Sequence, residues 1–403
     1  AFYFLIVANN KNQTRINGLN NNIQLYIFTE IFRRLSRTWY PILFLFYIFI
    51  QLDLKLFGYL VAVTSITVLI FEVPSGVFAD QYGRKLSYMI GQIILILTSF
   101  VFILSNNFVY LIIAAFLYGL SNSFLSGADK ALIFDSFYEL KRSNEFRLYN
   151  GKLYAYTMVV AAISTFISGF IAEYNWNILF FIGIIFGLIN LILISKFYEP
   201  KIHEKTSHKL HFKKSVLELI NSRTLLFLVI LFIFINSLLE SLSDYHQVFA
   251  MEVGWTVSSF AMLFSISFML SGISAYIIET IEKYIKKDFA LYAVPVLMGL
   301  VYFFMGYLNN YYGILLFIFE GLLIGYYYVV LEDIINHNVS SRRRATIWSL
   351  SSFVEQIFVG LSSIFIAYFS TFFGFQFSYI FVGLFIGLGG FICAKLSLRF
   401  MKK

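Results

Sequence analysis

The stretch that decides the fold is Glu72-Val73-Pro74-Ser75-Gly76-Val77-Phe78-Ala79-Asp80-Gln81-Tyr82-Gly83-Arg84-Lys85. Apolar segments precede and follow it, and they predict helices at about 56–79 and 86–105. Each helix would be long enough to cross a hydrocarbon core of about 30 Å. A carboxylate, two glycines and two cations therefore lie in a turn between two membrane spans.

The composition of the whole chain is that of a polytopic membrane protein. Its 403 residues are 59% hydrophobic and only 13% charged, whereas soluble domains carry about 25% charged residues. The mean hydropathy is +0.78. The apolar segments are continuous and do not alternate with period two, which excludes a membrane barrel. We therefore expect an all-α integral membrane protein.

Segments of spanning length recur along the chain. The apolar runs predict twelve transmembrane helices, at about 26–50, 56–79, 86–105, 108–136, 149–173, 177–197, 224–250, 256–281, 289–308, 312–336, 345–370 and 375–398.

The longest polar break, 199–223, separates six predicted helices from six others. It is basic and carries His203, His208 and His211, and we interpret it as a solvated linker, not a metal site. The predicted domains are an N-terminal polar segment at 1–22, a six-helix bundle at 23–198, a cytoplasmic linker at 199–223, a second six-helix bundle at 224–398 and a cytoplasmic tail at 399–403.

The basic residues indicate the orientation in the membrane. The predicted outer loops contain only one of the 30 Lys and Arg residues, Lys55. The positive-inside rule then places both termini in the cytoplasm, with the protein in the cell membrane. The net charge of +8 follows from this placement, so we expect no nucleic-acid partner. We also expect a monomer.

The pattern Gly-x-x-x-Asp-x-x-Gly-Arg-Lys at 76–85 resembles the signature loop of the major facilitator superfamily, between the second and third transmembrane helices. The resemblance covers essentially the whole chain. It implies two pseudo-symmetric six-helix bundles, the major facilitator fold, and secondary transport by alternating access. The small molecule that is carried is not encoded in this loop.

The same loop predicts a gate. Asp80 would contact the start of the eleventh predicted helix near Thr346, where the helix dipole favours an anion. The resemblance implies that this contact locks the outward-facing state, and that Arg84 then pairs with Asp135. The alternative is a turn that only sets the orientation. The gating residues are Gly76, for close helix approach, Gly83, for the tight turn, Asp80, Arg84, Lys85 and Asp135.

Ionisable residues inside predicted spans are the candidates for proton coupling or substrate binding, because a charge in the bilayer is costly unless it is paired, protonated or hydrated. Glu72 lies about 12 Å along the same helix from Asp80, and its alternative role is a fixed hydrogen bond near Pro74. The candidates are Arg37, Glu72, Asp129, Glu240, Asp244 and Glu355.

The first predicted span carries Glu30, Arg33, Arg34 and Arg37 along one face. Glu30 can pair with Arg33 or Arg34 at one-turn spacing. We expect Arg33 and Arg34 to extend to the inner headgroups. Arg37 lies deeper, where it would meet Glu72 or an anionic substrate.

The seventh predicted span has a polar stripe, formed by Asn236, Glu240, Asp244 and Gln247. Two carboxylates at i and i+4 repel each other when both are ionised, which suits a proton carrier. The alternative is a polar contact with another helix or with the outer mouth.

The match to efflux antiporters of the superfamily is partial. Their Arg-x-x-Gln-Gly element is replaced by Phe116-Leu117-Tyr118-Gly119, and their Gly-Pro-x-x-Gly-Gly element by a proline-free segment at 164–169. The Glu-x-Pro-x-Gly at 72–76 favours a drug:proton antiporter.

No Walker loop, dinucleotide fingerprint or metal-ligand cluster occurs in the sequence. We therefore expect no enzyme, cofactor or metal. The function predicted is proton-coupled efflux of a small amphipathic or hydrophobic compound. The alternatives are a proton symporter or uniporter for a polar nutrient, and a non-transporting membrane sensor or scaffold on the same fold.

Overall fold

The regular elements of the computed structural model are all helices in the part of the chain that it describes. The described residues are 2–105, 107–126, 128–200, 217, 219–339 and 344–401. The predicted linker histidines, His203, His208 and His211, lie outside them.

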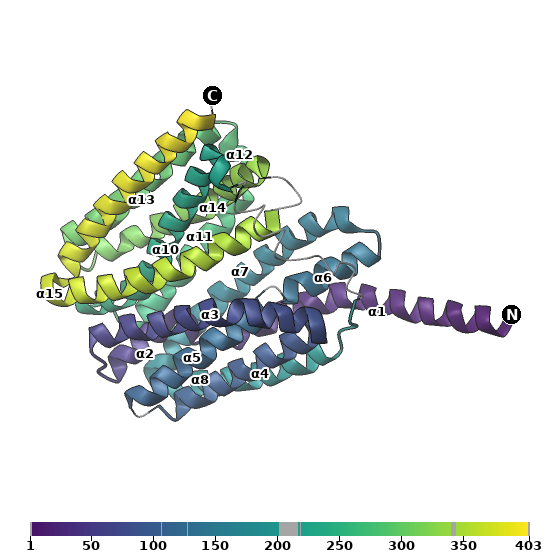
Figure 1. Cartoon of the computed structure of the whole chain (residues 1–403). Coiled ribbons are helices and arrows are strands. Elements are labelled where there is room, and N and C mark those ends of the chain that lie inside the picture. The colour runs from purple at the N-terminus through teal and green to yellow at the C-terminus, as the bar shows by residue number, and fades with distance from the viewer. Residues whose placement is uncertain are drawn as a thin grey trace. The chain divides into compact units, whose positions relative to one another are not determined.

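The helices follow one another along the chain as Figure 1 shows. The first are α1 (Phe2–Leu35), η1 (Tyr40–Ile42), α2 (Leu43–Phe49), α3 (Leu54–Tyr82), α4 (Arg84–Ile103), α5 (Phe108–Leu125), α6 (Ala128–Glu139), α7 (Ser143–Tyr174) and α8 (Trp176–Ser195). The others are α10 (Arg223–Glu252), α11 (Val257–Tyr276), α12 (Ile278–Glu282), α13 (Lys287–Leu308), η2 (Gly313–Leu316), α14 (Phe317–Asn338) and α15 (Arg344–Met401).

Among the described residues, 10 helices are long and apolar enough to cross a membrane. One of them, Leu350–Met401, has 52 residues. It contains Gly374 at φ 81, outside the helical region, so it holds the two spans predicted at 345–370 and 375–398. The prediction of an all-α membrane protein is confirmed.

The first predicted span, 26–50, is not one continuous helix. Helix α1 ends at Leu35 and α2 begins at Leu43, with a turn and η1 between them. Pro41 lies in this break, and proline inside a helix removes a donor and clashes with the carbonyl four residues earlier. The helix is therefore interrupted directly after Arg33 and Arg34, and Arg37 lies in the break.

The chain forms two compact units. Unit 1 comprises Ala1–Pro41, Ile66–Ser164 and Asn175–Lys205, and unit 2 comprises Ile42–Ser65, Thr165–Tyr174 and Thr206–Lys403. This division differs from the predicted bundles at 23–198 and 224–398 in giving Ile42–Ser65 and Thr165–Tyr174 to the second unit. The six-plus-six organisation stays a prediction.

In unit 1, α4 packs against both α5 and α8, and α1 packs against α6 and α8. Tyr88 of α4 is fully buried in a core with Tyr26 of α1 and Ile133 of α6. The Tyr88 hydroxyl donates to the carboxylate of Glu30 on α1. Part of the candidate site therefore lies at this junction.

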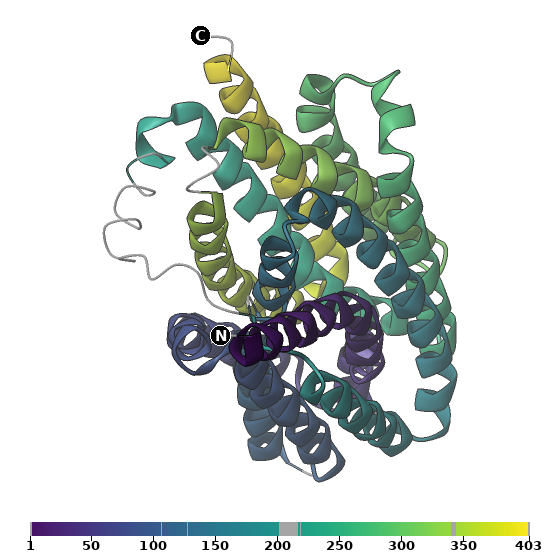
Figure 2. The ribbon, with the colours of Figure 1, turned by 90° about the vertical axis from the view of Figure 1, so that its right-hand side faces the viewer.

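In unit 2, α15 packs against α10 and α13, and α11 packs against α14 (Figure 2). Helices α13 and α15 approach closely at small residues: a Cβ on Gly299 would lie 2.7 Å from the Cα of Gly387. Without a hydrophobic driving force between helices in lipid, such close contact supplies much of the association energy.

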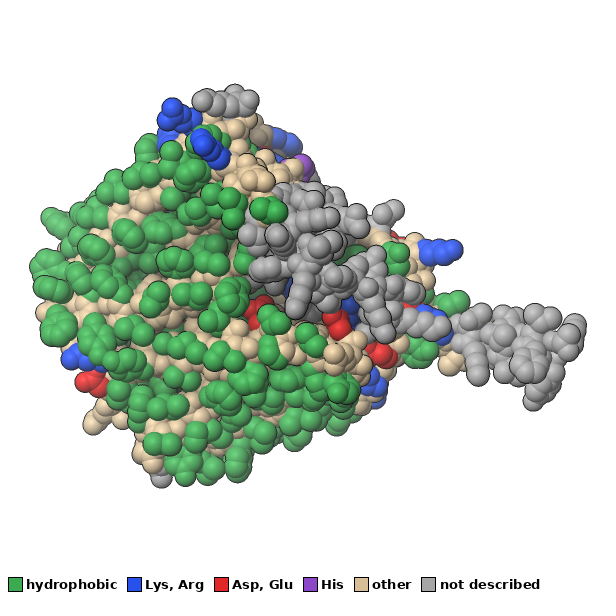
Figure 3. Space-filling view, viewed as in Figure 1, with side chains coloured by type: hydrophobic (Ala, Val, Ile, Leu, Met, Phe, Trp, Pro, Cys, Tyr) green, Lys and Arg blue, Asp and Glu red, His purple; other side chains and the backbone are tan. Residues whose placement is uncertain are grey.

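Large hydrophobic side chains cover the face of the protein shown in Figure 3. Among the described residues, large hydrophobic side chains with more than half of their surface exposed include Val109 at 62%, Leu388 at 63% and Phe372 at 70%. A soluble protein rarely exposes so much contiguous apolar surface, whereas hydrocarbon chains of a bilayer cover it at no cost.

The polar segment predicted at 1–22 belongs to a helix, which its polar sequence did not predict. Helix α1 begins at Phe2, and Asn22 is fully buried near its middle. The Asn22 side chain donates to the Tyr198 carbonyl at 2.8 Å and to the Ser136 hydroxyl at 3.0 Å. Asparagine thus serves here as a buried hydrogen-bonding group that fastens α1 to its neighbours.

Candidate functional site

The turn between α3 and α4 is as tight as its glycine predicts. Gly83 has φ 110 and ψ 144, a region that is essentially restricted to glycine. Helix α4 can therefore begin at Arg84, with Gly83 as the one residue between it and the end of α3.

Arg84 fastens this turn to α6. Its guanidinium forms the predicted ion pair with the Asp135 carboxylate and donates to the Ala131 carbonyl at 2.6 Å. Two contacts with one helix hold the cation in a defined position, so the turn and α6 move together.

Glu199 binds the start of α4, a role that the sequence did not reveal. Its two carboxylate oxygens accept from the backbone N–H groups of Arg84 at 2.7 Å and of Lys85 at 2.8 Å. The first N–H groups of a helix lack internal partners, and the helix dipole favours an anion there. The signal in the sequence was the first carboxylate after α8, at the edge of the predicted linker.

Gly76 corrects one prediction. A Cβ at this position would meet no described atom within 4 Å, so the close helix approach expected there is not seen. Gly76 lies on an exposed face of α3. Asp80 is also exposed, and the side chain of Thr346, its predicted neighbour, lies outside the described ones. The gate at Asp80 stays a prediction.

The two glycines of the loop are expected to respond in opposite ways to alanine. Gly83→Ala should lower the free energy of unfolding by about 1–3 kcal/mol because of its backbone angles, and the added Cβ would also lie 3.3 Å from Glu199 Cδ. Gly76→Ala, in a helix with open space around it, should raise stability by up to about 1 kcal/mol. Thermal unfolding in detergent measures both, and equal effects would contradict the assignment.

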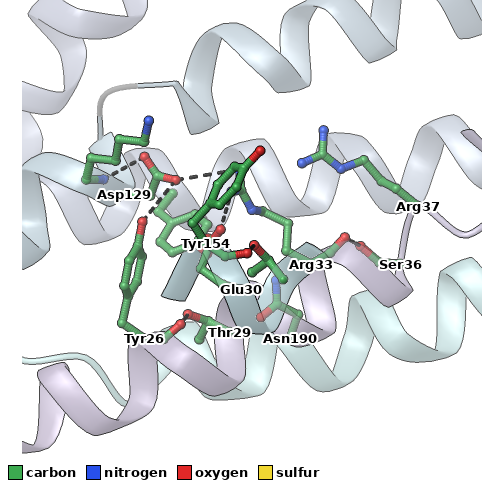
Figure 4. Close-up of polar contacts among 12 residues, drawn as sticks. Tyr26, Thr29, Glu30, Arg33, Ser36, Arg37, Asp129, Tyr154 and Asn190 are labelled. Carbon is green, nitrogen blue, oxygen red and sulfur yellow. Dashed lines mark hydrogen bonds and ion pairs between the residues drawn. The ribbon is translucent and has the colours of Figure 1, made fainter. Parts of the chain in front are cut away.

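A buried charge cluster joins α1 to α6 in unit 1 (Figure 4). Glu30 and Asp129 are 5% and 3% exposed. Arg33 lies between them, ion-paired with Glu30 and with its Nη1 atom 3.5 Å from Asp129 Oδ2. The expectation that Arg33 extends to the headgroups is therefore wrong, because two buried carboxylates hold it inside the protein.

Neutral donors complete the cluster. The Tyr26 hydroxyl donates to Asp129 at 3.4 Å, and the Tyr88 hydroxyl donates to Glu30 at 3.3 Å. The backbone N–H of Lys130 donates to Asp129 at 2.6 Å. Asp129 is thus fully engaged, and its place among the candidates for proton coupling stays a prediction.

Arg34 and Arg37 lie beyond this cluster. The Arg37 guanidinium donates to the amide oxygen of Asn122 on α5 at 3.3 Å. The Nε atom of Arg34 is buried without a hydrogen-bond partner. Among the described residues, neither guanidinium forms an ion pair with a carboxylate, so the alternative pairing of Arg37 with Glu72 is not seen.

A group of three carboxylates lies in unit 2. Glu240 and Asp244 are on α10, Glu355 is on α15, and both Asp244 and Glu355 lie within electrostatic range of Glu240. Asp244 and Glu355 are partly buried, whereas Glu240 is exposed. In the part of the chain that the structure describes, no cation pairs with any of the three. We call them the acidic cluster.

The other predicted member of the polar stripe, Gln247, has a structural partner. It is buried, and its side-chain oxygen accepts from the backbone N–H of Leu45 near the start of α2 at 3.2 Å. This is the helix contact that the sequence left open as an alternative for the stripe.

Sequence reasoning missed a buried histidine next to this stripe. His246 Nε2 lies 3.1 Å from Glu320 Oε2 on α14, and the two side chains are 1% and 5% exposed. The Nδ1 atom of His246 is 2.6 Å from the Tyr379 hydroxyl. His246 does not share the helix face of Glu240. The sequence around it therefore gave no signal of a polar partner on α14.

A family model described as Major Facilitator Superfamily matches residues 25–361. The chain belongs to the major facilitator superfamily. The match includes the signature loop, the charge cluster of unit 1 and the acidic cluster, so all of these features are part of one transporter scaffold.

One relative of this facilitator is an uncharacterized MFS-type transporter of Bacillus subtilis (strain 168), YxaM. It is 26% identical over 260 residues, which are 62% of this chain and 63% of that relative. The chain thus matches less than two thirds of that relative's length.

Solved structures of other transporters have the same fold. The nucleoside transporter NupG matches with a TM-score of 0.74 at 12% identity, covering 95% of this chain and 100% of that one. A bacterial homologue of the human lysosomal transporter Spinster gives 0.73 at 15% identity, covering 95% and 98%. The POT family transporter PepTSo gives 0.74 at 12%, covering 95% and 99%.

In this facilitator, Glu72 is a partly buried carboxylate on α3. Its backbone carbonyl accepts from Ser75, but its side chain has no ion pair or hydrogen bond among the described residues. The fixed hydrogen bond considered for Glu72 near Pro74 therefore involves its backbone and not its carboxylate.

Proposed function

We propose that the chain is a secondary active transporter that exports a small amphipathic or hydrophobic compound in exchange for protons, by alternating access. It acts in the cell membrane as a monomer with both termini in the cytoplasm. Membership of a transporter superfamily supports transport of a small molecule rather than catalysis. Proton exchange and the outward direction are the parts proposed here.

The observation that carries proton coupling is the acidic cluster. Asp244 and Glu355 each lie within electrostatic range of Glu240. Among the described residues, none of the three carboxylates pairs with a cation. Carboxylates so placed repel each other, and neutralising one by a proton relieves the repulsion. A site that gains and loses a proton as its hydration changes is what a proton carrier needs.

One observation favours symport of a polar compound as the second candidate. The arginines of unit 1 form a polar group inside the protein that a purely hydrophobic substrate would not use. The structural neighbours include transporters named for nucleosides and a POT family transporter, and the likeness extends to the fold alone. The direction of proton movement relative to substrate separates the two candidates.

Export is tested in inverted membrane vesicles with an acidified lumen. A panel of fluorescent amphipathic compounds is added outside, on the face that was cytoplasmic. Accumulation of at least one compound that stops when a protonophore collapses the pH gradient supports the proposal. Accumulation that persists without the gradient rejects proton coupling.

Asp80→Asn tests the gate in the signature loop. A contact between a carboxylate and a helix N-terminus contributes about 0.3–1 kcal/mol, so its loss should shift the conformational equilibrium roughly two- to fivefold toward the inward-open state. The measured quantities are the transport rate and the cytoplasmic accessibility of cysteine probes. Unchanged values of both would show that Asp80 has no gating role.

A further inference from the structure

One arginine of unit 1 contacts both carboxylates of the buried charge cluster. Glu30 and Asp129 both contact Arg33, so both carboxylates of the cluster are paired with the same arginine. Arg34 and Arg37 remain, each without a carboxylate partner among the described residues.

Both remaining arginines lie near α5. Arg37 donates to Asn122 of α5, and Arg34 lies within electrostatic range of Tyr118, also on α5. Both side chains are partly exposed. Figure 4 shows Arg37 apart from the ion pairs of the cluster, with no contact drawn to Glu30 or Asp129.

The end of α1 does not account for two unpaired cations. The C-terminal carbonyls of a helix favour cations within the last turn, and Arg34 precedes the last residue, Leu35, by one position. That stabilisation is several-fold smaller than the cost of an ionised arginine in a membrane. Arg37 lies beyond the helix end, and its one hydrogen-bond partner, Asn122, is neutral.

We propose that Arg34 and Arg37 bind an anionic group, a carboxylate or a phosphate, of the transported compound. This inference rests on the proposed transport function and names its substrate class. Guanidinium groups bind such oxyanions through paired N–H donors, and the buried Nε–H of Arg34 is a donor without a partner.

A stacked pair of tyrosines, Tyr40 and Tyr118, lies in the same unit, and Tyr118 is within electrostatic range of Arg34. The rings of Tyr40 and Tyr118 are stacked, with centroids 4.9 Å apart, and Tyr40 is 39% exposed. An amphipathic organic anion would place its charge on the guanidinium groups and its apolar part on these rings.

The test is ligand binding to the purified full-length protein in detergent, without any gradient. The probes are phenylacetate and phenyl phosphate, compared with the neutral 2-phenylethanol and with inorganic phosphate. We expect at least one of the two anionic probes to bind tenfold or more tightly than 2-phenylethanol. Arg34→Gln and Arg37→Gln should each remove most of this preference.

Control variants separate the site from general charge effects. Arg142→Gln removes a cation whose side chain is 42% exposed and pairs with Glu145, and it should leave the preference unchanged. Arg34→Lys and Arg37→Lys keep the positive charge but lack the planar guanidinium group. They should therefore lose less of the preference for anionic probes than the glutamine variants do. They replace the glutamine variants if those fail to fold.

Three results would overturn the inference: equal binding of the neutral and anionic probes, a preference that survives in both arginine variants, or no binding of any anion at millimolar concentration. Binding is measured without protons moving. If the anion preference is intact but no proton-driven transport occurs, the proposed function is rejected and the anion site remains. If proton-driven transport occurs but the anion preference is absent, only the anion site is rejected.

Discussion

Replacing Arg33 with methionine is expected to lower the free energy of unfolding by about 3–5 kcal/mol, the cost of leaving a buried ion without its partner. Two buried carboxylates, Glu30 and Asp129, would lose the one ion-pair partner that they have among the described residues. The hydroxyls of Tyr26 and Tyr88 would remain as donors, but neutral donors at 3.3–3.4 Å do not replace a charge. The measurement is thermal unfolding in detergent.

A matched control and a rescue make this test specific. Arg142→Met removes an arginine from an exposed pair with Glu145, and exposed pairs contribute only about 0–1 kcal/mol. Combining Arg33→Met with Glu30→Gln and Asp129→Asn removes all three charges, and the triple variant should recover most of the loss. If Arg33→Met were no more harmful than Arg142→Met, the cluster would not hold α1 to α6.

The second large effect is expected in transport rather than stability. Combining Glu240→Gln, Asp244→Asn and Glu355→Gln removes the acidic cluster and should reduce proton-driven transport to the level of vesicles without protein. Exchange of labelled for unlabelled compound at equal pH on both sides should continue, because the substrate does not need the proton for exchange. Accumulation and exchange are measured in the same proteoliposomes.

The three single substitutions identify the residue that carries the proton. The carrier should reproduce the triple variant alone, while the other two alter only the pH at which transport is half-maximal. Glu145→Gln, at an exposed position, serves as control and should change neither quantity. Proton-driven accumulation that survives in the triple variant would place the coupling at another group, and His246 with Glu320 would then be the first to examine.

Much of the fold was predictable because membrane spans are decided by local sequence. The continuous apolar runs predicted helices that the structure contains, and the loop at 76–85 was specific enough to predict both the tight turn at Gly83 and the pair between Arg84 and Asp135. The residues themselves predict the turn, because few residue types can satisfy a one-residue turn between two helices. The ion pair was implied by the resemblance to the superfamily's loop.

The interruption of the first span was not predicted, although Pro41 was visible. An apolar run of the right length on both sides of a proline looks like one helix, and kinked helices with proline are common in membranes. The polar segment before it was also misjudged. It was predicted only as a polar segment outside the spans, but it is helical, and Asn22 is fully buried because Ser136 and Tyr198 supply its partners.

Pairings between distant helices were the main limit for the site. Nothing in the sequence around His246 indicates Glu320, 74 positions later, or Tyr379 as neighbours. Similarly, Arg33 and Arg34 have identical local settings, yet one is neutralised by Asp129 and the other has no carboxylate partner among the described residues. Successive residues of α1 point in directions about 100° apart, so the two side chains meet different neighbours.

Proton movement in sealed proteoliposomes tests the central claim most directly. A trapped pH indicator reports the lumen while an amphipathic compound that the protein carries is added outside, and protein-free vesicles give the background. Exchange of the compound for protons predicts that the lumen becomes more alkaline as the compound enters, and that this change is lost in the triple carboxylate variant. Acidification of the lumen, or entry of the compound with no change in pH, would contradict proton-coupled antiport.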